Sequence, residues 1–145
     1  MATTIEATLR HVLFLARHLN NCSPKCVAVV ALLELGIPTK LVGFDLLEKA
    51  IVISCEQPEL MTTKEVFLAI GQQYTSALVF EQIDQAVRTA ISDAWKCRDD
   101  DVWRCYFPQV MANGMRKPTN AEFVSQLAKF VELWEECRKK AVYER

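Results

Sequence analysis

Side chains that can read the edges of DNA bases recur at helical spacing between Phe80 and Lys96. Amides, hydroxyls and one guanidinium lie on one side of this stretch, and such groups pair with base edges in the major groove. The stretch also holds three acids against two bases, whereas a DNA-reading helix usually gains affinity from positive charge near phosphates. We expect five of its residues to face bases or phosphates: Gln82, Asp84, Gln85, Arg88 and Thr89.

An apolar stripe on the other side predicts that this stretch is one amphipathic helix. The stripe consists of Phe80, Ile83, Val87, Ala90, Ile91, Ala94 and Trp95. A second helix is predicted before it, from the capping box Thr62–Glu65 to about Tyr74. The two helices follow each other as in a helix-turn-helix, where the second helix enters the groove. The alternative is that both are ordinary core helices.

Helical periodicity continues through the rest of the chain, which predicts an all-α fold: a compact bundle of about six helices with a helix-turn-helix variant. Capping boxes are expected at Thr3–Glu6 and Thr119–Glu122, and Ser23 with Pro24 and Gly36 should delimit another helix. We predict a loop over Phe107–Lys117. The remaining helices are predicted at Thr4–Leu19, Pro24–Leu35, Phe44–Cys55, Val102–Tyr106 after an acidic cap at Asp99–Asp101, and from the last capping box to about Val142.

Composition favours one folded domain. The chain has 145 residues, of which 51% are hydrophobic and 24% charged, so it can bury a substantial core. Its net charge is −1, which gives no general attraction to nucleic acid or to anionic membranes. No targeting segment and no membrane-spanning apolar run is visible, so we expect a cytoplasmic protein with no membrane partner.

The side-chain chemistry does not favour catalysis. His11 and His18 are the only histidines, and the sequence contains no nucleophile motif and no phosphate-binding glycine loop. We therefore expect no enzyme activity, no cofactor and no small-molecule substrate.

Six cysteines raise two other interpretations. A secreted disulfide scaffold is the first, but a well-cored helical chain has little need of disulfides, so cytosolic thiols are favoured. The second is a metal site, because His18, Cys22 and Cys26 are spaced along one line of a helix. Ser23-Pro24 interrupts that line and zinc sites usually use tighter pairs, so no metal is expected.

Three segments carry a resemblance to a known family. They are LLELGIPTKLVGFDLLEKAI (Leu32–Ile51), AVRTAISDAW (Ala86–Trp95) and KPTNAEF (Lys117–Phe123). In this order and spacing they resemble the C-terminal DNA-binding effector domain of the sporulation-initiation response regulator, stage zero sporulation protein A, over roughly Val27–Lys129. The resemblance implies an all-helical domain that binds DNA sequence-specifically, as pairs on adjacent half-sites, to regulate transcription at the start of sporulation.

The resemblance makes Phe80–Lys96 the recognition helix and also shows where this chain departs from the family. Gln82 and Gln85 stand where the family usually has arginine, and Thr89 replaces a histidine. Asp84 and Arg88 match the family pattern. Glutamine can still pair with adenine, but each missing arginine removes a guanine or phosphate partner. Backbone contacts are expected from Thr75, Ser76, Arg104 and Lys117, although Lys117 next to a capping box is also consistent with a plain helix cap.

The N-terminal residues differ from the full regulator, whose receiver domain has no room in this chain. We expect residues 1–21 to form an extra helix that packs on the domain or makes a dimer contact, and residues 22–145 to form the domain itself. The leading prediction is a receiver-less, DNA-binding transcription regulator that binds double-stranded DNA, with a homodimer as an expectation. The alternative is a helical interaction module that has lost DNA binding and dimerises with or antagonises a full-length regulator.

Overall fold

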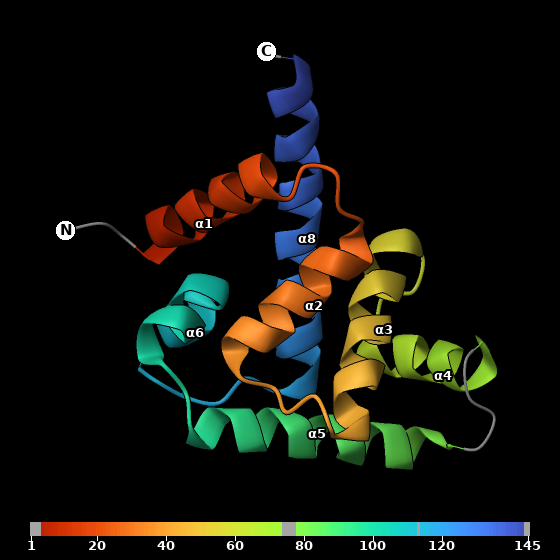
Figure 1. Cartoon of the computed structure of the whole chain (residues 1–145). Coiled ribbons are helices and arrows are strands. Elements are labelled where there is room, and N and C mark those ends of the chain that lie inside the picture. The colour runs from red at the N-terminus through yellow and green to blue at the C-terminus, as the bar shows by residue number, and fades with distance from the viewer. Residues whose placement is uncertain (1–3, 74–77, 113, 144–145) are drawn as a thin grey trace.

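The computed structural model describes residues 4–73, 78–112 and 114–143, and within these residues it contains only helices. The prediction of an all-α fold is therefore confirmed. Eight helices are present in the described ranges, roughly as predicted: seven correspond to predicted segments, and the short helix α7 is additional (Figure 1). They are α1 (Thr4–His18), α2 (Pro24–Leu35), α3 (Val42–Glu56), α4 (Thr63–Gln73), α5 (Phe80–Lys96), α6 (Asp100–Tyr106), α7 (Pro108–Met111) and α8 (Asn120–Tyr143).

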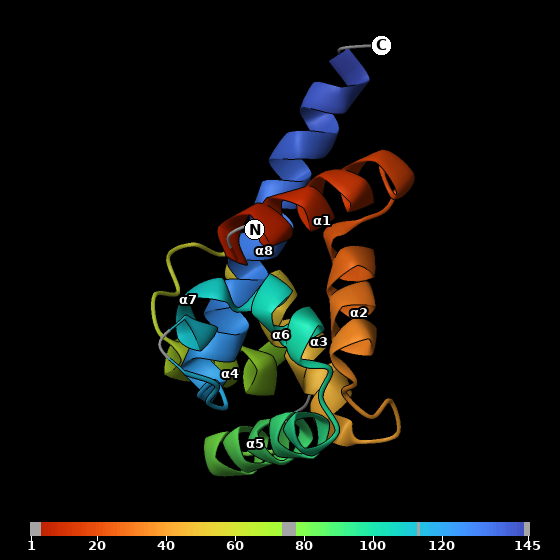
Figure 2. The same cartoon turned by 90° about the vertical axis from the view of Figure 1, so that its left-hand side faces the viewer.

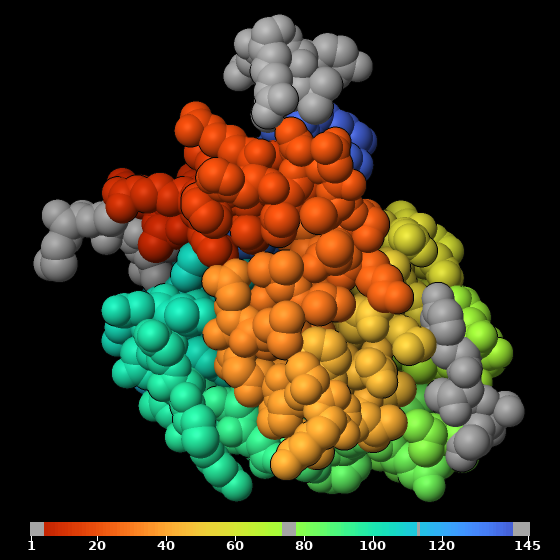
Figure 3. All heavy atoms as spheres, viewed as in Figure 1, coloured from red at the N-terminus to blue at the C-terminus, as the bar shows by residue number. Residues whose placement is uncertain are grey.

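Helix α8 is the central element, and α1, α2 and α3 pack against it. Helix α5 lies across one end of the molecule, and the last turns of α8 extend beyond the other end (Figures 1 and 2). Helix α1 lies at that other end, where its side chains meet those of α2 and α6 in a continuous surface (Figure 3). Helix α5 therefore has one side that no other helix covers (Figures 1 and 2).

Local sequence determines where most helices begin. Ser23 Oγ accepts a hydrogen bond from the Cys26 N–H at 3.2 Å, and Pro24 follows at the first helical position. One half of the predicted capping box at Thr62–Glu65 is formed, because the Glu65 N–H donates to Thr62 Oγ1, while the Glu65 carboxylate accepts from the Thr62 hydroxyl. Asp99 caps α6 as predicted. The box at Thr3–Glu6 lies partly outside the described residues.

The predicted loop at Phe107–Lys117 is wrong in its first part, because α7 occupies Pro108–Met111. Pro108 was interpreted as a loop residue, but proline also suits the first helical position, where its missing N–H costs nothing. Phe107 and Met111 are both buried and anchor this short helix to the core. Pro108 alone is compatible with both a loop and a helix start, whereas the burial of Phe107 and Met111 indicates the helix.

A cluster of buried aromatic rings connects α6 and the segment after it to α8. Trp103, Phe107 and Phe123 are fully buried, with ring centroids 5.1 to 6.0 Å apart. Trp95 at the end of α5 packs edge-on against Trp103 at 5.3 Å. These contacts hold the C-terminal end of α5 on the core, while its exposed side stays open.

Helix α1 packs on the domain, which was one of the two expectations for it. Val12, Leu15 and Ala16 are buried, and His11 Nε2 lies 3.0 Å from Glu34 Oε1 and 3.1 Å from Tyr106 Oη. Its outer side keeps four half-exposed apolar residues: Ile5, Leu9, Leu13 and Phe14. None of the helices in the described ranges is both long and apolar enough to cross a bilayer.

Candidate nucleic-acid interface

Helix α5 separates its residues into a buried side and an exposed side, as its sequence pattern predicts. Ile83, Val87, Ala90, Ile91 and Ala94 are at most 2% exposed. Most polar residues predicted to contact DNA lie on the exposed side: Gln82, Gln85, Arg88 and Thr89 are exposed, and Asp84 is half-buried. The structure therefore brings these five predicted site residues together on one helix.

Gln82 closes the N-terminus of α5. The residue before the helix is Val79, which has no polar side chain to cap it, and the Val79 N–H donates to Gln82 Oε1 at 3.0 Å. The carbonyl end of this amide is therefore used inside the protein, while the Nε2 group has no bond of this kind within the described residues. Gln82 consequently presents a hydrogen-bond donor to a ligand in this conformation.

Hydrogen bonds along the helix orient the next polar residues. Arg88 donates to Asp84 Oδ2 at 2.8 Å and to Gln85 Oε1 at 3.2 Å. Gln85 Nε2 donates in turn to Thr89 Oγ1 at 3.2 Å. These pairs are three and four residues apart, the spacing at which helical side chains meet. The guanidinium is therefore held in place, and its charge is largely balanced by Asp84.

Asp84 also ties α5 to the start of α8. Asn120 Nδ2 lies 2.9 Å from both the side-chain Oδ1 and the main-chain carbonyl of Asp84 and donates to them. Both carboxylate oxygens of Asp84 are thus engaged by Asn120 and Arg88. This geometry gives Asp84 a positioning role within the protein. Sequence reasoning did not select Asn120 as a site residue, although it lies within the KPTNAEF motif.

The start of α8 forms a polar corner beside α5. Lys117 Nζ donates to Ser92 Oγ at 2.8 Å, and Arg116 makes a two-pronged pair with Glu122 at 2.7 and 2.8 Å. Glu122 also accepts from the Thr119 N–H, which completes the predicted capping box. The Arg116 guanidinium and this N–H lower the pKa of Glu122 to about 2. A hollow of about 340 Å³ lies here, lined by Arg88, Ile91 and Lys117–Ala121.

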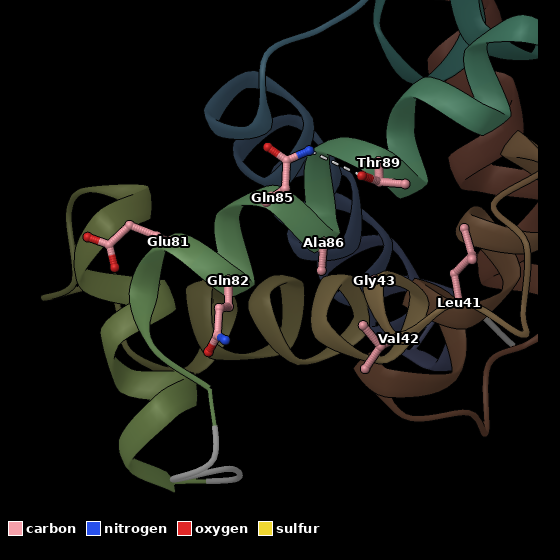
Figure 4. A pocket seen from close by; sticks show the side chains of 8 residues that line it. All are labelled: Leu41, Val42, Gly43, Glu81, Gln82, Gln85, Ala86 and Thr89. Atoms are coloured by element: carbon pink, nitrogen blue, oxygen red, sulfur yellow. Dashed lines mark hydrogen bonds between the residues drawn. The ribbon is translucent and has the colours of Figure 1, made fainter.

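The start of α3 lies along the other side of α5. A Cβ atom on Gly43 would lie 2.5 Å from the Ala86 carbonyl oxygen and 2.7 Å from Ala90 Cβ, so only glycine permits this approach. Beside the crossing is an open, mostly apolar groove of about 490 Å³ (Figure 4). It is lined by Leu41, Val42, Gly43, Glu81, Gln82, Gln85, Ala86 and Thr89. Leu41 and Val42 were not predicted as site residues; the neighbouring Gly43 was the available signal.

The basic residues near this surface are mostly paired with acids. Arg88 pairs with Asp84, Arg116 with Glu122, and Arg104 with Asp101 at 3.4 Å. Arg104 lies on α6, beyond the C-terminal end of α5 (Figure 1). For Lys117 and Lys96, the described residues show no ion pair. Thr75 and Ser76 lie outside the described residues.

All six cysteines are free. Burial raises the pKa of Cys55 to about 12 and that of Cys105 to about 11, so both stay as thiols near neutral pH. In the part of the chain that the structure describes, no group of three or more metal-ligating side chains gathers at one place.

The family comparison agrees with this geometry. The family model described as "Sporulation initiation factor Spo0A C terminal" matches residues 29–131, which is more than two thirds of the chain. The match spans α3, α4 and α5, the aromatic cluster and the first half of α8. No solved structure matches the chain significantly. The chain belongs to the Spo0A C-terminal family, the DNA-binding, transcription-regulating effector domains of sporulation initiation.

Proposed function

We propose that this protein regulates transcription by inserting α5 into the major groove of a specific double-stranded DNA site. One observation carries the proposal: the exposed side of α5 is flanked on both sides by the first turn of another helix. Gln82, Ala86 and Thr89 border the groove beside α3, and Arg88 and Ile91 border the hollow at the start of α8. In the major groove the base edges lie between two sugar–phosphate strands. The polar side of α5 would face the bases, and the two helix N-termini beside it would face the strands.

The dimensions support this arrangement. A helix with its side chains is about 10–12 Å wide, and the major groove is about 12 Å wide. With α5 in the groove, the first turns of α3 and α8 would approach the two sugar–phosphate strands. Helix N-termini attract phosphates because their N–H groups and dipoles point outward. The α8 side adds the positive charge of Lys117, which forms no ion pair within the described residues and donates to Ser92.

The predicted site residues take different roles in this proposal. Gln82, Gln85 and Thr89 would face base edges, since they project from the exposed side of α5. Arg88 and Lys117 would contact phosphates at the α8 corner, and Asp84 would hold Arg88 and Asn120 in place. Arg104 would reach the DNA backbone only beyond the C-terminal end of α5. Thr75 and Ser76 remain proposals based on sequence, at the turn before α5.

The test is selection from random duplex DNA at low and moderate salt, followed by binding measurements on the enriched duplex. We expect an enriched sequence. Arg88→Ala and Lys117→Ala should each weaken binding and reduce the slope of log K against log salt by about one, as each removes one phosphate contact. Arg10→Ala is the matched control: it removes the same charge from an exposed site on α1, at the opposite end of the molecule (Figure 1).

Two results would contradict the proposal. Selection that enriches no sequence at either salt concentration rejects sequence-specific binding and leaves the interaction-module alternative. Equal effects of Arg88→Ala and Arg10→Ala would show that net charge matters and the α5 surface does not.

We also propose that two copies bind adjacent half-sites as a homodimer, in which case the enriched sequence should contain two repeats at a fixed spacing. A single unrepeated site would reject the homodimer alone.

A further inference from the structure

The groove between α3 and α5 has an unusual composition for a DNA-reading surface. Leu41, Val42 and Ala86 form an apolar floor, and Gln82 stands at its rim, whereas the Gln85 side chain points away from α3 and donates to Thr89 (Figure 4). Figure 4 shows Gln82 and Ala86 pointing toward α3, with Val42 across from them. Val42 is 56% exposed, so an apolar surface is presented to solvent directly beside the polar side of α5.

An apolar recess has one natural counterpart among the base edges of the major groove. The edges of adenine, guanine and cytosine present hydrogen-bonding atoms, whereas thymine also presents a methyl group on C5. The same methyl group occurs on 5-methylcytosine. From the apolar floor we therefore conclude that the groove suits a pyrimidine C5-methyl group.

The rim distinguishes between these two pyrimidines. Gln82 Oε1 accepts a hydrogen bond from the Val79 N–H, which holds the amide in one orientation, and its Nε2 group remains as the donor that this side chain offers to a base. Next to its methyl group, thymine carries the O4 acceptor, which complements that donor. 5-Methylcytosine carries an amino donor at the same position, so two donors would face each other and one buried group would stay unpaired.

We infer that the groove formed by Leu41, Val42 and Ala86, with Gln82 at its rim, is a recognition site for thymine in the major groove. This inference rests on the proposed function, since it requires α5 to lie in that groove. Gly43 makes the site, because its lack of a side chain lets Val42 lie beside α5 at the level of Ala86. The bound sequence consequently contains at least one thymine whose methyl group contacts Val42.

The experiment replaces single thymines by deoxyuridine in the duplex enriched by selection, which removes only the methyl group. Affinity is measured by fluorescence anisotropy for wild type, Val42→Ala and Leu33→Ala. Leu33 is the matched control, because it is 51% exposed on α2 and does not line the groove. At one or two positions, deoxyuridine should weaken wild-type binding about fourfold, the value of one buried methyl group. Leu33→Ala should keep this effect, and Val42→Ala should abolish it.

A second arm replaces the sensitive thymine–adenine pair by 5-methylcytosine–guanine. We expect binding to be lost by about tenfold or more, because the methyl group is present while the acceptor beside it is replaced by a donor. Retained binding would overturn the role of Gln82 and leave a site that reads the methyl group only.

The remaining outcomes separate this inference from the proposed function. A duplex that is bound tightly but is indifferent to deoxyuridine at every thymine overturns the thymine site and leaves DNA binding intact. A deoxyuridine effect that persists in Val42→Ala places the methyl contact elsewhere and also overturns it. If wild type binds no duplex at low salt, the proposed function fails, and the thymine site fails with it.

Discussion

The two flanks of α5 are held in place by different kinds of interaction. On the α3 flank, Gly43 lets the backbone of α3 approach Ala86 and Ala90 of α5 closely. On the α8 flank, Asn120 and Lys117 donate hydrogen bonds to Asp84 and Ser92 of α5, and Glu122 forms an ion pair with Arg116 beside them. Packing depends little on salt or pH, whereas exposed ion pairs depend on both. The α3 flank should therefore stay fixed under conditions that loosen the α8 flank.

The largest effect is expected at the packed flank. Gly43→Ala places a methyl group 2.5 Å from the Ala86 carbonyl oxygen, so α3 and α5 must separate. Forced overpacking of this kind typically costs 1–3 kcal/mol, and we expect about 3 kcal/mol because the obstacle is backbone. Urea unfolding measures the loss.

Gly71→Ala is the control for this substitution. Gly71 lies inside α4, and its added Cβ would meet the nearest atom, the Leu78 carbonyl oxygen, at an ordinary 3.5 Å. Alanine is also the better helix former, so stability should stay unchanged or rise by up to about 1 kcal/mol. If the two substitutions have the same effect, close approach at Gly43 does not hold the α3 flank.

The polar flank should respond less strongly to the loss of one group. Asn120→Ala removes both hydrogen bonds to Asp84 and leaves a half-buried carboxylate without its partner from α8. We expect a loss of about 1–2 kcal/mol in the free energy of unfolding. Ser125→Ala is the control on the same helix, since its hydroxyl makes only a long 3.4 Å bond to the Glu122 carbonyl. A cost no greater than that of the control would show that Asn120 does not connect α5 to α8.

The helices were predictable because their signals are local. Phe80–Lys96 was predicted with the boundaries that the structure has, since its apolar stripe and its polar side alternate within one helix. Ser23, Pro24 and Gly36 likewise act on neighbouring residues. Helix α7 was missed because Pro108 is compatible with both a loop and a helix start, and burial of Phe107 and Met111 decides between them.

The site was less predictable because its partners are distant in sequence. Asp84 and Asn120 are 36 positions apart, so their hydrogen bonds depend on the packing of α5 against α8. The prediction placed Asp84 toward bases or phosphates, and only the structure reveals that both carboxylate oxygens are engaged within the protein. Val42 was absent from the predicted site for the same reason: it reaches α5 only because α3 crosses at Gly43.

The smallest effect on the free energy of unfolding is expected at Glu122. It should depend on pH, whereas the effect of a substitution on the α3 flank should not. Arg116 and the Thr119 N–H lower the pKa of this carboxyl from 4.5 to about 2 in the folded protein. A lowered pKa stabilises the fold above the unfolded value, and that contribution is lost as pH falls from about 4.5 through about 2.

Glu122→Gln should therefore reduce the free energy of unfolding by about 1 kcal/mol near pH 7 and have almost no effect near pH 2. The pair lies at the surface, with side chains 55% and 32% exposed, so solvent screening keeps the effect small. Glu132→Gln is the control, because its pair with Lys129 is long, at 3.9 Å, and exposed. Thermal unfolding between pH 2 and pH 7 measures both variants. A pH-independent difference between wild type and Glu122→Gln would mean that the ionised carboxylate does not stabilise the α8 corner. Gly43→Ala supplies the contrast, since its cost should be the same across this pH range.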